Sequence, residues 1–387
     1  MISSEKTGVW GLEDVYLKAN ESYWTYAGDN GEVGGELYAW GANAYGQIGE
    51  STTVDRSSPV QIPGTQWVKP SMAYYEVVST KTDGTLWAWG YNSNGSVGDN
   101  TKVHRSSPVQ LPGTQWQKDA VVRGRSTIAR KADNTLWAWG NNSYGALGQN
   151  NRTERSSPYQ IPGTEWSQIV INGGYQNSTQ SCFKTDNTWW IWGYNAYGVF
   201  AQNDAVPRSS PVQIAGTNWK RGQFETSVAA QVSSGIKTDG TLWIWGNGGY
   251  GQLGDNSRET HSSPVQIGGT QWKATCAGRH SSYHVKTDGT LWATGRNHNG
   301  QLGQNSLQQY SSPVQIPGTQ WVFGIGSYYS AAALKTDGTL WTWGHGTYGQ
   351  HGLNIITNVS SPTQIPGTGW DWITGMVYGH AAIKLTS

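Results

Sequence analysis

The chain has 387 residues, and its 26 Lys and Arg residues nearly balance its 25 Asp and Glu residues, for a formal net charge of +1. This balance excludes both an acidic tail and the basic surface that nucleic-acid binding requires, so we expect no nucleic-acid partner. Glycine is abundant, at 52 residues, while 23 Trp and 20 Tyr far outnumber 4 Phe and 3 Met. Such a composition is typical of many short strands joined by tight turns.

The start of the chain carries no targeting pattern. Its first residues, MISSEKTGVWGLEDVYLK, lack the basic and then apolar order of a secretion signal, so we expect no signal peptide. No segment of the chain approaches the roughly 20 apolar residues that a membrane-spanning helix needs, so we expect no membrane insertion.

Residues 1–34 precede the first repeated motif, and we predict that they form an N-terminal arm outside a domain of residues 35–387. An arm rich in aromatic residues suits an anchor or oligomerisation segment that docks on another subunit. These aromatic residues are Trp10, Tyr16, Tyr23, Trp24 and Tyr26. In an alternative, residues 23–27 (YWTYA) supply one strand of the domain, and the arm is shorter.

One phrase recurs along the rest of the chain. Its most regular marker is Ser-Ser-Pro, which returns at intervals of about fifty residues. The prolines of this marker are Pro59, Pro108, Pro158, Pro211, Pro264, Pro313 and Pro362. Seven similar units predict an architecture in which each unit is one structural element.

Each unit contains a β-hairpin pattern. Residues 333–344 (ALKTDGTLWTWG) predict two strands joined by a two-residue Asp-Gly turn, in which both residues need a positive φ. Two units carry Asp-Asn instead, at residues 133–134 and 186–187, and asparagine also tolerates this conformation. The variation therefore supports the turn.

The strand after the turn is apolar on both faces. In TLWAWG, Trp87 and Trp89 share one face, and Leu86 and Ala88 share the other. Such a strand must lie between two sheets, which a radial arrangement of small sheets provides in every unit. The segment SSPVQIPG predicts a further strand with proline at its start and end, where a missing N–H costs least.

The two ends of the chain look complementary. Residues 379–387 (GHAAIKLTS) align with residues 329–337 (YSAAALKTD), and their hairpin partner is then residues 35–41 (GELYAWG) near the start. With this C-terminal strand included, each of the three strand types occurs seven times. The sequence therefore predicts an all-β, seven-bladed β-propeller closed by pairing of its N- and C-terminal strands.

The motif order A-L-K-T-D-G-x-L-W-x-W-G-x-N-x-x-G-Q-L-G resembles the regulator of chromosome condensation repeat family over residues 35–387. The resemblance implies a seven-bladed propeller. The family includes a nuclear guanine-nucleotide exchange factor and a secreted bacterial inhibitor of β-lactamases, so the fold does not choose one function. The exchange factor works through an inserted wedge, for which the evenly spaced repeats here leave no room.

Most repeated residues have a structural explanation. The glycine-rich loops lack the helix and the Lys-Ser/Thr of a phosphate-binding loop, and the turn aspartates are too dispersed to meet at one atom. We assign the tryptophans to blade packing, and we expect no cofactor and no metal site. Thr294 and Tyr38 replace tryptophans and predict local repacking. Cys182 and Cys276 fall at different places in the repeat, so we expect no disulfide.

The units diverge just before the strand that leads into the turn. Ring symmetry places these seven segments on one face near the central opening, and Tyr and Arg are typical of binding hot spots. The predicted binding face consists of Tyr74, Tyr75, Arg123, Arg125, Tyr175, Gln176, Asn177, Phe224, Glu225, Arg279, His280, Tyr328, Tyr329, Tyr378 and His380. A second variable strip before Ser-Ser-Pro carries Arg56, Arg105, Arg155 and Arg208, and we rank it second.

We expect a non-enzymatic binding or structural module that presents this face to a protein partner or a surface glycan, with self-association through the arm. Residues 8–18 (GVWGLEDVYLK) resemble the openings of phage-encoded and marine viral structural proteins, which favours a virion tail, fibre or decoration component in a virion or extracellular assembly. The alternative is a regulatory or inhibitory protein-binding propeller. An enzyme such as a glycosidase needs paired acids, and the variable face offers Glu76 and Glu225 from non-adjacent units.

Overall fold

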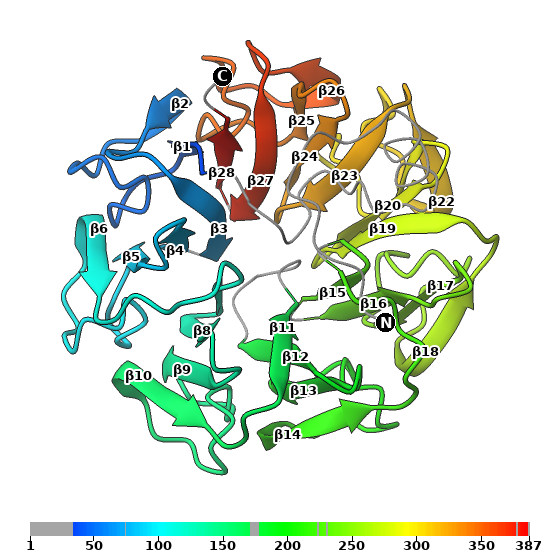
Figure 1. Cartoon of the computed structure of the whole chain (residues 1–387). Helices are drawn as coiled ribbons and strands as arrows, with labels where there is room; N and C mark the ends of the chain where they lie inside the picture. Colours follow the sequence, from blue (N-terminus) through cyan, green and yellow to red (C-terminus); the bar gives the residue numbers. More distant parts are fainter. Residues whose placement is uncertain are drawn as a thin grey trace, which may run out of the picture.

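The computed structural model describes residues 34–73, 75–170, 178–222, 224–229, 231–376 and 378–385. These residues form seven sheets of four strands each. Figure 1 shows the sheets arranged radially around a central axis, so the predicted seven-bladed β-propeller is confirmed. Within the described ranges there is no helix long and apolar enough to cross a membrane.

Each blade runs from an inner strand at the axis to an outer strand at the rim (Figure 1). The inner strands are β3 (Trp67–Ala73), β7 (Val121–Arg123), β11 (Trp166–Ile169), β15 (Thr226–Val228), β19 (Trp272–Ala277), β23 (Trp321–Gly326) and β27 (Trp370–Met376). The second strands are β4 (Glu76–Lys81), β8 (Ser126–Arg130), β12 (Thr179–Lys184), β16 (Val232–Ile236), β20 (Ser281–Lys286), β24 (Ser330–Lys335) and β28 (Gly379–Lys384).

The third strands carry the LWxWG motif. They are β5 (Leu86–Gly90), β9 (Leu136–Gly140), β13 (Trp189–Gly193), β17 (Leu242–Gly246), β21 (Leu291–Gly295), β25 (Leu340–Gly344) and β1 (Glu36–Gly41). The outer strands are β6 (Arg105–Leu111), β10 (Arg155–Ile161), β14 (Arg208–Ile214), β18 (His261–Ile267), β22 (Tyr310–Ile316), β26 (Val359–Gln364) and β2 (Arg56–Gln61). We number the blades from blade 1 (β3 to β6) to blade 7 (β27, β28, β1 and β2).

The ring closes as the sequence predicts. In blade 7 the strand order is β2-β1-β28-β27, so two strands come from each end of the chain. β1 pairs with β28 in a continuous antiparallel register from Glu36 opposite Lys384 to Gly41 opposite Gly379. The inner strand, in contrast, is absent from the sequence prediction, because its residues differ widely between units, from WVKPSMA in β3 to TSV in β15.

The predicted two-residue turn is wrong in detail. Gly84 N donates to the Lys81 carbonyl and Lys81 N donates to the Thr85 carbonyl, so Thr82 joins the loop. Only the glycine of the Asp-Gly pair has a positive φ, +77°. This is a three-residue loop that ends in a glycine bulge, and Asp83 Oδ1 stabilises it by accepting from Thr85 N and Oγ1 at 3.0 and 2.7 Å.

The outer strand begins earlier than predicted. β6 starts at Arg105, so Pro108 lies in its middle rather than at its start. The register between β5 and β6 shifts there, from Ala88 opposite Val109 to Gly90 opposite Arg105. An outer strand with an irregular ladder tolerates proline, because the missing N–H has no partner to lose.

A tryptophan hydrogen bond joins neighbouring blades. Trp139 in blade 2 donates from Nε1 to the Ser96 carbonyl of blade 1 at 2.8 Å. The equivalent donors and carbonyls are Trp40 and Gln350, Trp89 and Gln47, Trp192 and Ala146, Trp245 and Val199, and Trp343 and Gln301. Thr294, which replaces this tryptophan in blade 5, keeps the bond through Oγ1 to the Gln252 carbonyl, at 3.1 Å.

A backbone hydrogen bond joins the same two blades near the rim. We call the boundary between neighbouring blades the seam. Asn100 in blade 1, with a φ of +60°, donates its N–H to the Ser156 carbonyl of blade 2 at 2.8 Å. Gly95 lies so close to this strand that a Cβ on it would come within 2.6 Å of Ser156 Cα. The recurrent glycine of one blade therefore packs directly against the recurrent serine of Ser-Ser-Pro in the next blade.

The other tryptophans pack as predicted. Lys81 Nζ lies over the rings of Trp67 and Trp87, 4.5 and 4.8 Å from their centres. Five further lysines lie between two tryptophans in the same way, namely Lys131, Lys184, Lys237, Lys286 and Lys335. Tyr38, which replaces one tryptophan in blade 7, packs edge-on against Trp370 with ring centres 5.6 Å apart.

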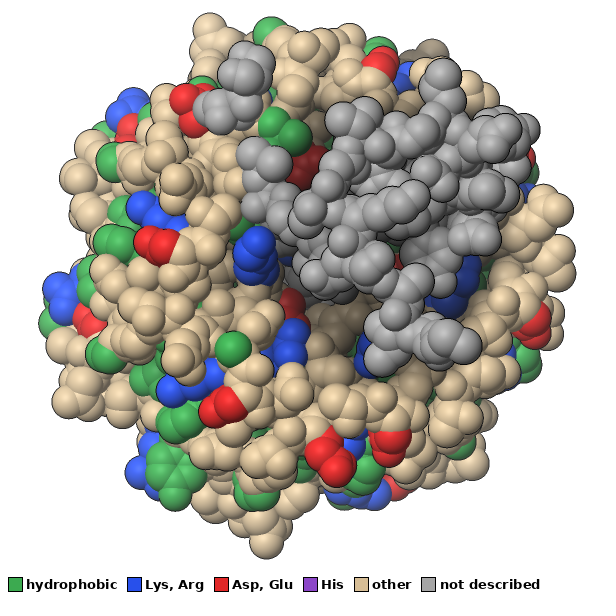
Figure 2. Space-filling model, in the orientation of Figure 1, with side chains coloured by type: hydrophobic (Ala, Val, Ile, Leu, Met, Phe, Trp, Pro, Cys, Tyr) green, Lys and Arg blue, Asp and Glu red, His purple; other side chains and the backbone are tan. Residues whose placement is uncertain are grey.

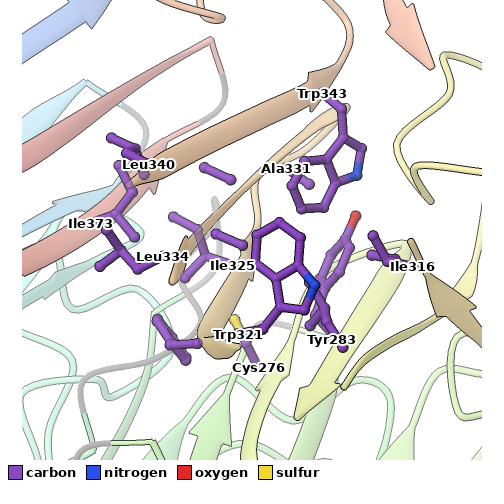
Figure 3. Close-up of a cluster of buried hydrophobic side chains, with 14 of the residues drawn as sticks. Cys276, Tyr283, Ile316, Trp321, Ile325, Ala331, Leu334, Leu340, Trp343 and Ile373 are labelled. Carbon is purple, nitrogen blue, oxygen red and sulfur yellow. The ribbon is translucent and has the colours of Figure 1, made fainter. Parts of the chain in front are cut away.

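The core fills the spaces between blades. Figure 3 shows one such region, where Cys276, Tyr283, Trp321 and Trp343 lie close together. Tyr283 Oη and Trp343 Nε1 both donate to the Gln301 carbonyl, each at 2.7 Å. Both cysteines are free, without a disulfide, and both are buried. Burial raises the pKa of Cys276 to about 11, so its thiol stays protonated at neutral pH.

Deletion of residues 379–387 tests the closure. The deletion removes β28, and β1 and β2 then lose the strand that joins them to the ring. We expect the melting temperature in a fluorescence or circular-dichroism scan to fall by roughly 10 °C or more. Deletion of residues 1–33 is the control and should leave the melting temperature unchanged. Equal melting temperatures for the two deletions would contradict the closure.

Substitution of Trp139 by Phe tests the seam. Trp139→Phe keeps most of the ring but leaves the buried Ser96 carbonyl without its donor, so the free energy of unfolding in urea should fall by about 1–3 kcal/mol. The matched control is Trp137→Phe in the same strand. Trp137 is half-buried and bonds within its own blade, to Thr135 Oγ1 at 2.8 Å. A loss as large for the control would show that the bond across the seam is not special.

Candidate functional site

Two sets of loops lie at the same end of each blade, because successive strands are antiparallel. One set is the turns between inner and second strands, and the other is the longer loops between third and outer strands. We call this end the loop face. In support, Tyr45 in a long loop of blade 7 and Tyr75 in a turn of blade 1 have ring centres 4.7 Å apart. The opposite end, which carries the Thr-Asp-Gly turns, is the hairpin face.

Six residues of the predicted binding face lie in loop-face turns and are half-buried there. They are Tyr75, Arg125, Arg279, Tyr328, Tyr329 and Tyr378. Four others, Tyr74, Tyr175, Gln176 and Asn177, lie outside the described residues, as do the arm residues Trp10, Tyr16, Tyr23, Trp24 and Tyr26. Whether these side chains bind a partner stays a prediction.

Three predicted residues are buried rather than presented. Arg123 is 1% exposed, and its guanidinium donates to the carbonyl oxygens of Val170 and Thr179 in blade 3. His380 is fully buried against Trp40, with ring centres 6.0 Å apart. His280 is 6% exposed, so it forms the floor of the face rather than its surface.

Phe224 and Glu225 do not lie in a loop-face turn, where the sequence places them. The inner strand of blade 4 starts only at Thr226 and its turn follows Val228, so the two residues precede the strand. Phe224 instead reaches the rings of Phe323 and Trp372, with centres 4.3 and 5.5 Å away. This unit is among the longest, so matching it to its neighbours placed the turn too early.

The structure adds aromatic residues from the long loops, which sequence reasoning missed. Tyr250 packs against His280 of the next blade at 4.7 Å between ring centres, and Tyr348 packs against Tyr378 of the next blade at 4.6 Å. Two groups of contacting rings lie on the loop face, one from blades 7 and 1 and one from blades 4 to 7, and together we call them the aromatic belt. Its members are Tyr45, Tyr75, Tyr91, His104, Tyr250, His280, Tyr328, Tyr329, His345, Tyr348 and Tyr378.

A signal for two of these residues, Tyr91 and His345, exists in the sequence. The residue after the last glycine of LWxWG varies while the motif around it stays nearly constant. This position holds Ala42, Tyr91, Asn141, Tyr194, Asn247, Arg296 and His345. A variable position inside a constant motif is free of the framework. Tyr45, Tyr250 and Tyr348 carry no such signal, because their position is tyrosine in five of the seven units.

The second variable strip is not a free basic arc. Arg56 pairs with Glu50 at 2.6 Å, Arg105 with Asp99 at 2.5 Å and Arg208 with Asp204 at 2.6 Å. On the face that Figure 2 shows, Lys and Arg side chains are likewise interspersed with Asp and Glu. Local pairing of this kind neutralises these three arginines and contributes little stability, whereas Arg155 lies over the ring of Tyr159 at 4.9 Å from its centre.

The acids of the face do not form a catalytic pair. Glu76 is 2% exposed, and burial raises the pKa of its carboxyl to about 8, although Arg125 opposes the shift and Ser96 Oγ donates to Oε1 at 3.2 Å. Glu225 Oε2 accepts from Phe224 N at 3.0 Å, at the start of another blade's inner strand. Among the described residues, no group of three His, Cys, Asp or Glu side chains could hold a metal ion.

The buried histidine predicts a pH dependence of stability. Burial lowers the pKa of His380 to about 3, whereas an unfolded chain holds histidine near 6.5. The unfolded state therefore binds the extra proton first, and the contribution is complete above pH 6.5 and lost as pH falls toward 3. His380→Gln should reduce the slope of unfolding free energy against pH by about 1.4 kcal/mol per unit below pH 6. Urea unfolding at several pH values measures this slope, and parallel curves would contradict the assignment.

Solved structures share the fold over most of the chain. Prp20p from Saccharomyces cerevisiae, described together with its binding to Gsp1p and histones, is 15% identical, has a TM-score of 0.81 and covers 92% of this chain and 93% of its own. The same yeast protein bound to Kap60 gives a TM-score of 0.79 at 15% identity and covers 92% of this chain and 90% of that one. Human WBSCR16 is 19% identical, with a TM-score of 0.78 and coverage of 91% and 99%. Identities this low show the fold alone.

A curated relative matches a smaller part. The E3 ubiquitin-protein ligase HERC2 of Homo sapiens is 28% identical over 103 residues, which are 27% of this chain but 2% of HERC2. The chain thus spans a small fraction of that protein's length.

The repeat itself gives the most extensive match. The model of the regulator of chromosome condensation (RCC1) repeat matches residues 34–72, 83–122, 133–175, 239–283, 288–332 and 337–381. These stretches cover more than half of the sequence and follow the blades in phase. The chain therefore belongs to the RCC1 repeat family.

Proposed function

We propose that the chain is a non-enzymatic binding module whose loop face contacts a protein partner. The aromatic belt carries this proposal. Its two groups of rings bring tyrosines and histidines from several blades to the end of the ring where the units differ most, and arginines pack on these rings. Arg125 lies over Tyr91 at 4.8 Å from the ring centre, and Arg279 lies over Tyr328 at 4.9 Å.

The chemistry of the belt favours a protein as partner. Tyrosine and arginine dominate binding hot spots, because each offers a large contact area together with directed hydrogen bonds and loses little side-chain freedom on binding. Two of the family's yeast structures involve protein partners, with Gsp1p and histones for Prp20p and Kap60 for the same propeller. These partners support the class of ligand and do not transfer to this chain.

Two narrower forms of the proposal differ in setting. In one, the module is a virion tail, fibre or decoration component that recognises a protein or surface glycan, and residues 1–34 anchor it in the assembly. The support for this form is the resemblance of residues 8–18 to viral structural proteins. In the other, it is a regulatory or inhibitory propeller. Both use the loop face, so one experiment on that face tests what they share.

The test is selection of ligands from a random peptide library displayed on phage, with the immobilised full chain as target. Tyr45→Ser combined with Tyr348→Ser removes one half-buried and one exposed ring of the belt, and the affinity of selected peptides should fall by about tenfold or more. The matched control is Gln115→Ser combined with Glu165→Ser, two exposed residues of the hairpin face. Peptides that lose affinity for the control but not for the belt variant would refute a binding loop face.

A further inference from the structure

Two histidines meet at the seam between blades 6 and 7. His351 lies in the long loop of blade 6, directly after Gln350, whose carbonyl accepts the seam hydrogen bond from Trp40 Nε1 at 2.9 Å. His380 lies opposite Trp40 in the pairing of β1 with β28. Both histidines are fully buried. The tryptophan bond of this seam therefore has one buried, titratable side chain beside its acceptor and one beside its donor.

The same two positions hold residues that do not titrate in the other six units. The position of His351 is apolar there and holds Ile48, Val97, Leu147, Phe200, Leu253 and Leu302. The position of His380, opposite the seam residue, holds Val77, Thr127, Gln180, Ser233, Ser282 and Ala331. Both exceptions thus fall at one seam, and that seam belongs to blade 7, which closes the ring from both ends of the chain.

Polar contacts suit both rings in their neutral form. His351 Nε2 donates to the Gly344 carbonyl at 3.1 Å, which leaves Nδ1 to accept from Thr342 Oγ1 at 3.2 Å. His380 Nε2 lies 3.4 Å from Ser330 Oγ of blade 6, so this ring contacts the neighbouring blade directly. A second proton on His351 would have to take the place of the hydrogen that Thr342 gives to Nδ1.

The nearest titratable groups do not supply negative charge. In the part of the chain that the structure describes, the titratable group that acts on His380 is His351, and the one that acts on His351 is His345. His345 in turn lies near the rings of Tyr329 and Tyr348, which stay neutral in acid. Residues 345–358, the long loop of blade 6, contain no Asp or Glu.

The acids of blades 6 and 7 lie elsewhere. Glu36 and Asp371 lie toward the hairpin face, each four residues along its strand from the residue opposite His380, and Asp337 lies in a hairpin-face turn, where it accepts from Thr339. Lys335 and Lys384 end their strands at the same face. In the long loop of blade 7, Glu50 pairs with Arg56, and Asp55 accepts from Asn43 N at 2.7 Å. A proton on either histidine therefore meets no counter-charge among the described residues while the seam is closed.

These surroundings weaken proton binding to both rings. Burial lowers the pKa of His351 to about 4, although the hydrogen bond to the Gly344 carbonyl opposes the shift. Burial and the charge of His351 lower the pKa of His380 to about 3, although the Thr374 backbone opposes the shift. A solvated histidine titrates near pH 6.5, so below that pH an open seam binds protons that a closed seam does not. The population of the open seam should rise by up to about tenfold per pH unit for each histidine.

We propose that His351 and His380 make the seam between blades 6 and 7 open in acid, below about pH 6, while the other blades stay folded. The belt contact between Tyr348 and Tyr378, with ring centres 4.6 Å apart, crosses this seam, so opening would separate the two rings. Acid would then weaken binding at the loop face. This consequence rests on the proposed function, whereas the opening of the seam does not.

The test measures how fast a buried thiol at this seam reacts in the full chain. Ser330→Cys places a thiol at a fully buried position beside His380, and 4,4′-dithiodipyridine labels thiols even in acid. Peptide mass spectrometry reports this thiol together with the buried native thiols of Cys182 in blade 3 and Cys276 in blade 5, which are internal controls. Each rate is divided by the rate of the same thiol in the urea-unfolded chain at the same pH, which removes the pH dependence of the reagent.

The corrected rate for Ser330→Cys should rise from pH 7 to pH 5 by about 20-fold for each histidine, while Cys182 and Cys276 stay protected. His351→Leu and His380→Thr install the residues of blade 2, and each should remove one factor of about 20, so that the double variant shows no acid response. The matched control is His284→Ala. His284 is 1% exposed and burial lowers its pKa to about 3, but it lies in blade 5 against Trp272, so the control should keep the full response.

Melting temperatures at pH 7 confirm that all variants are folded before rates are compared. Equal acceleration of all three thiols in acid would indicate global unfolding and would overturn the proposal, as would a full acid response in the double variant. Library peptides that bind equally at pH 7 and pH 5 to a chain whose seam has opened would refute the consequence for binding alone. The thiol rates involve no ligand, so they would stand even if the loop face bound no partner.

Discussion

The fit between neighbouring blades is the constraint on which the rest of the structure depends. Trp139 buries its ring in one blade and gives its only N–H to a carbonyl of the blade before. Near the rim, Gly95 leaves no room for a side chain, because the strand of the next blade passes so close. A four-stranded blade cannot satisfy these groups alone, so each unit needs both neighbours and the ring must close.

The same seams position the candidate site. Several ring contacts of the belt, such as Tyr250 with His280 and Tyr348 with Tyr378, join side chains of adjacent blades. A rigid seam therefore fixes their spacing, although each ring lies on a loop. Loops held by a rigid scaffold in this way are preorganised for binding, which reduces the entropy that binding costs.

The structural features that the sequence predicts correctly are those that depend on residues repeated in every unit. Blade number, hairpins and closure are predictable because the tryptophans and glycines that form the seams occur in every unit. The inner strand is missed because it pairs on one side only and varies freely, and Phe224 is misplaced for the same reason. The turn type is missed because Asp-Gly alone does not show that Thr82 joins the loop. Tyr91 and His345 of the belt are missed because their variable position lies inside a constant motif, and Tyr45, Tyr250 and Tyr348 because they belong to the repeat itself.

The net charge of the chain says little about the loop face, because acids and arginines pair within individual long loops. Where a long loop carries an arginine it commonly carries the acid that pairs with it, as in Arg56 with Glu50 and Arg208 with Asp204. Blades 2 and 5 depart from this pattern, since Gln149 and Gln304 take the acid position, while blade 2 keeps Arg155 and blade 5 carries Arg296 at the start of the loop. Blade 5 also replaces its seam tryptophan with Thr294 yet keeps the hydrogen bond to blade 4. The contact between blades therefore stays constant while the charges of the long loops vary from unit to unit.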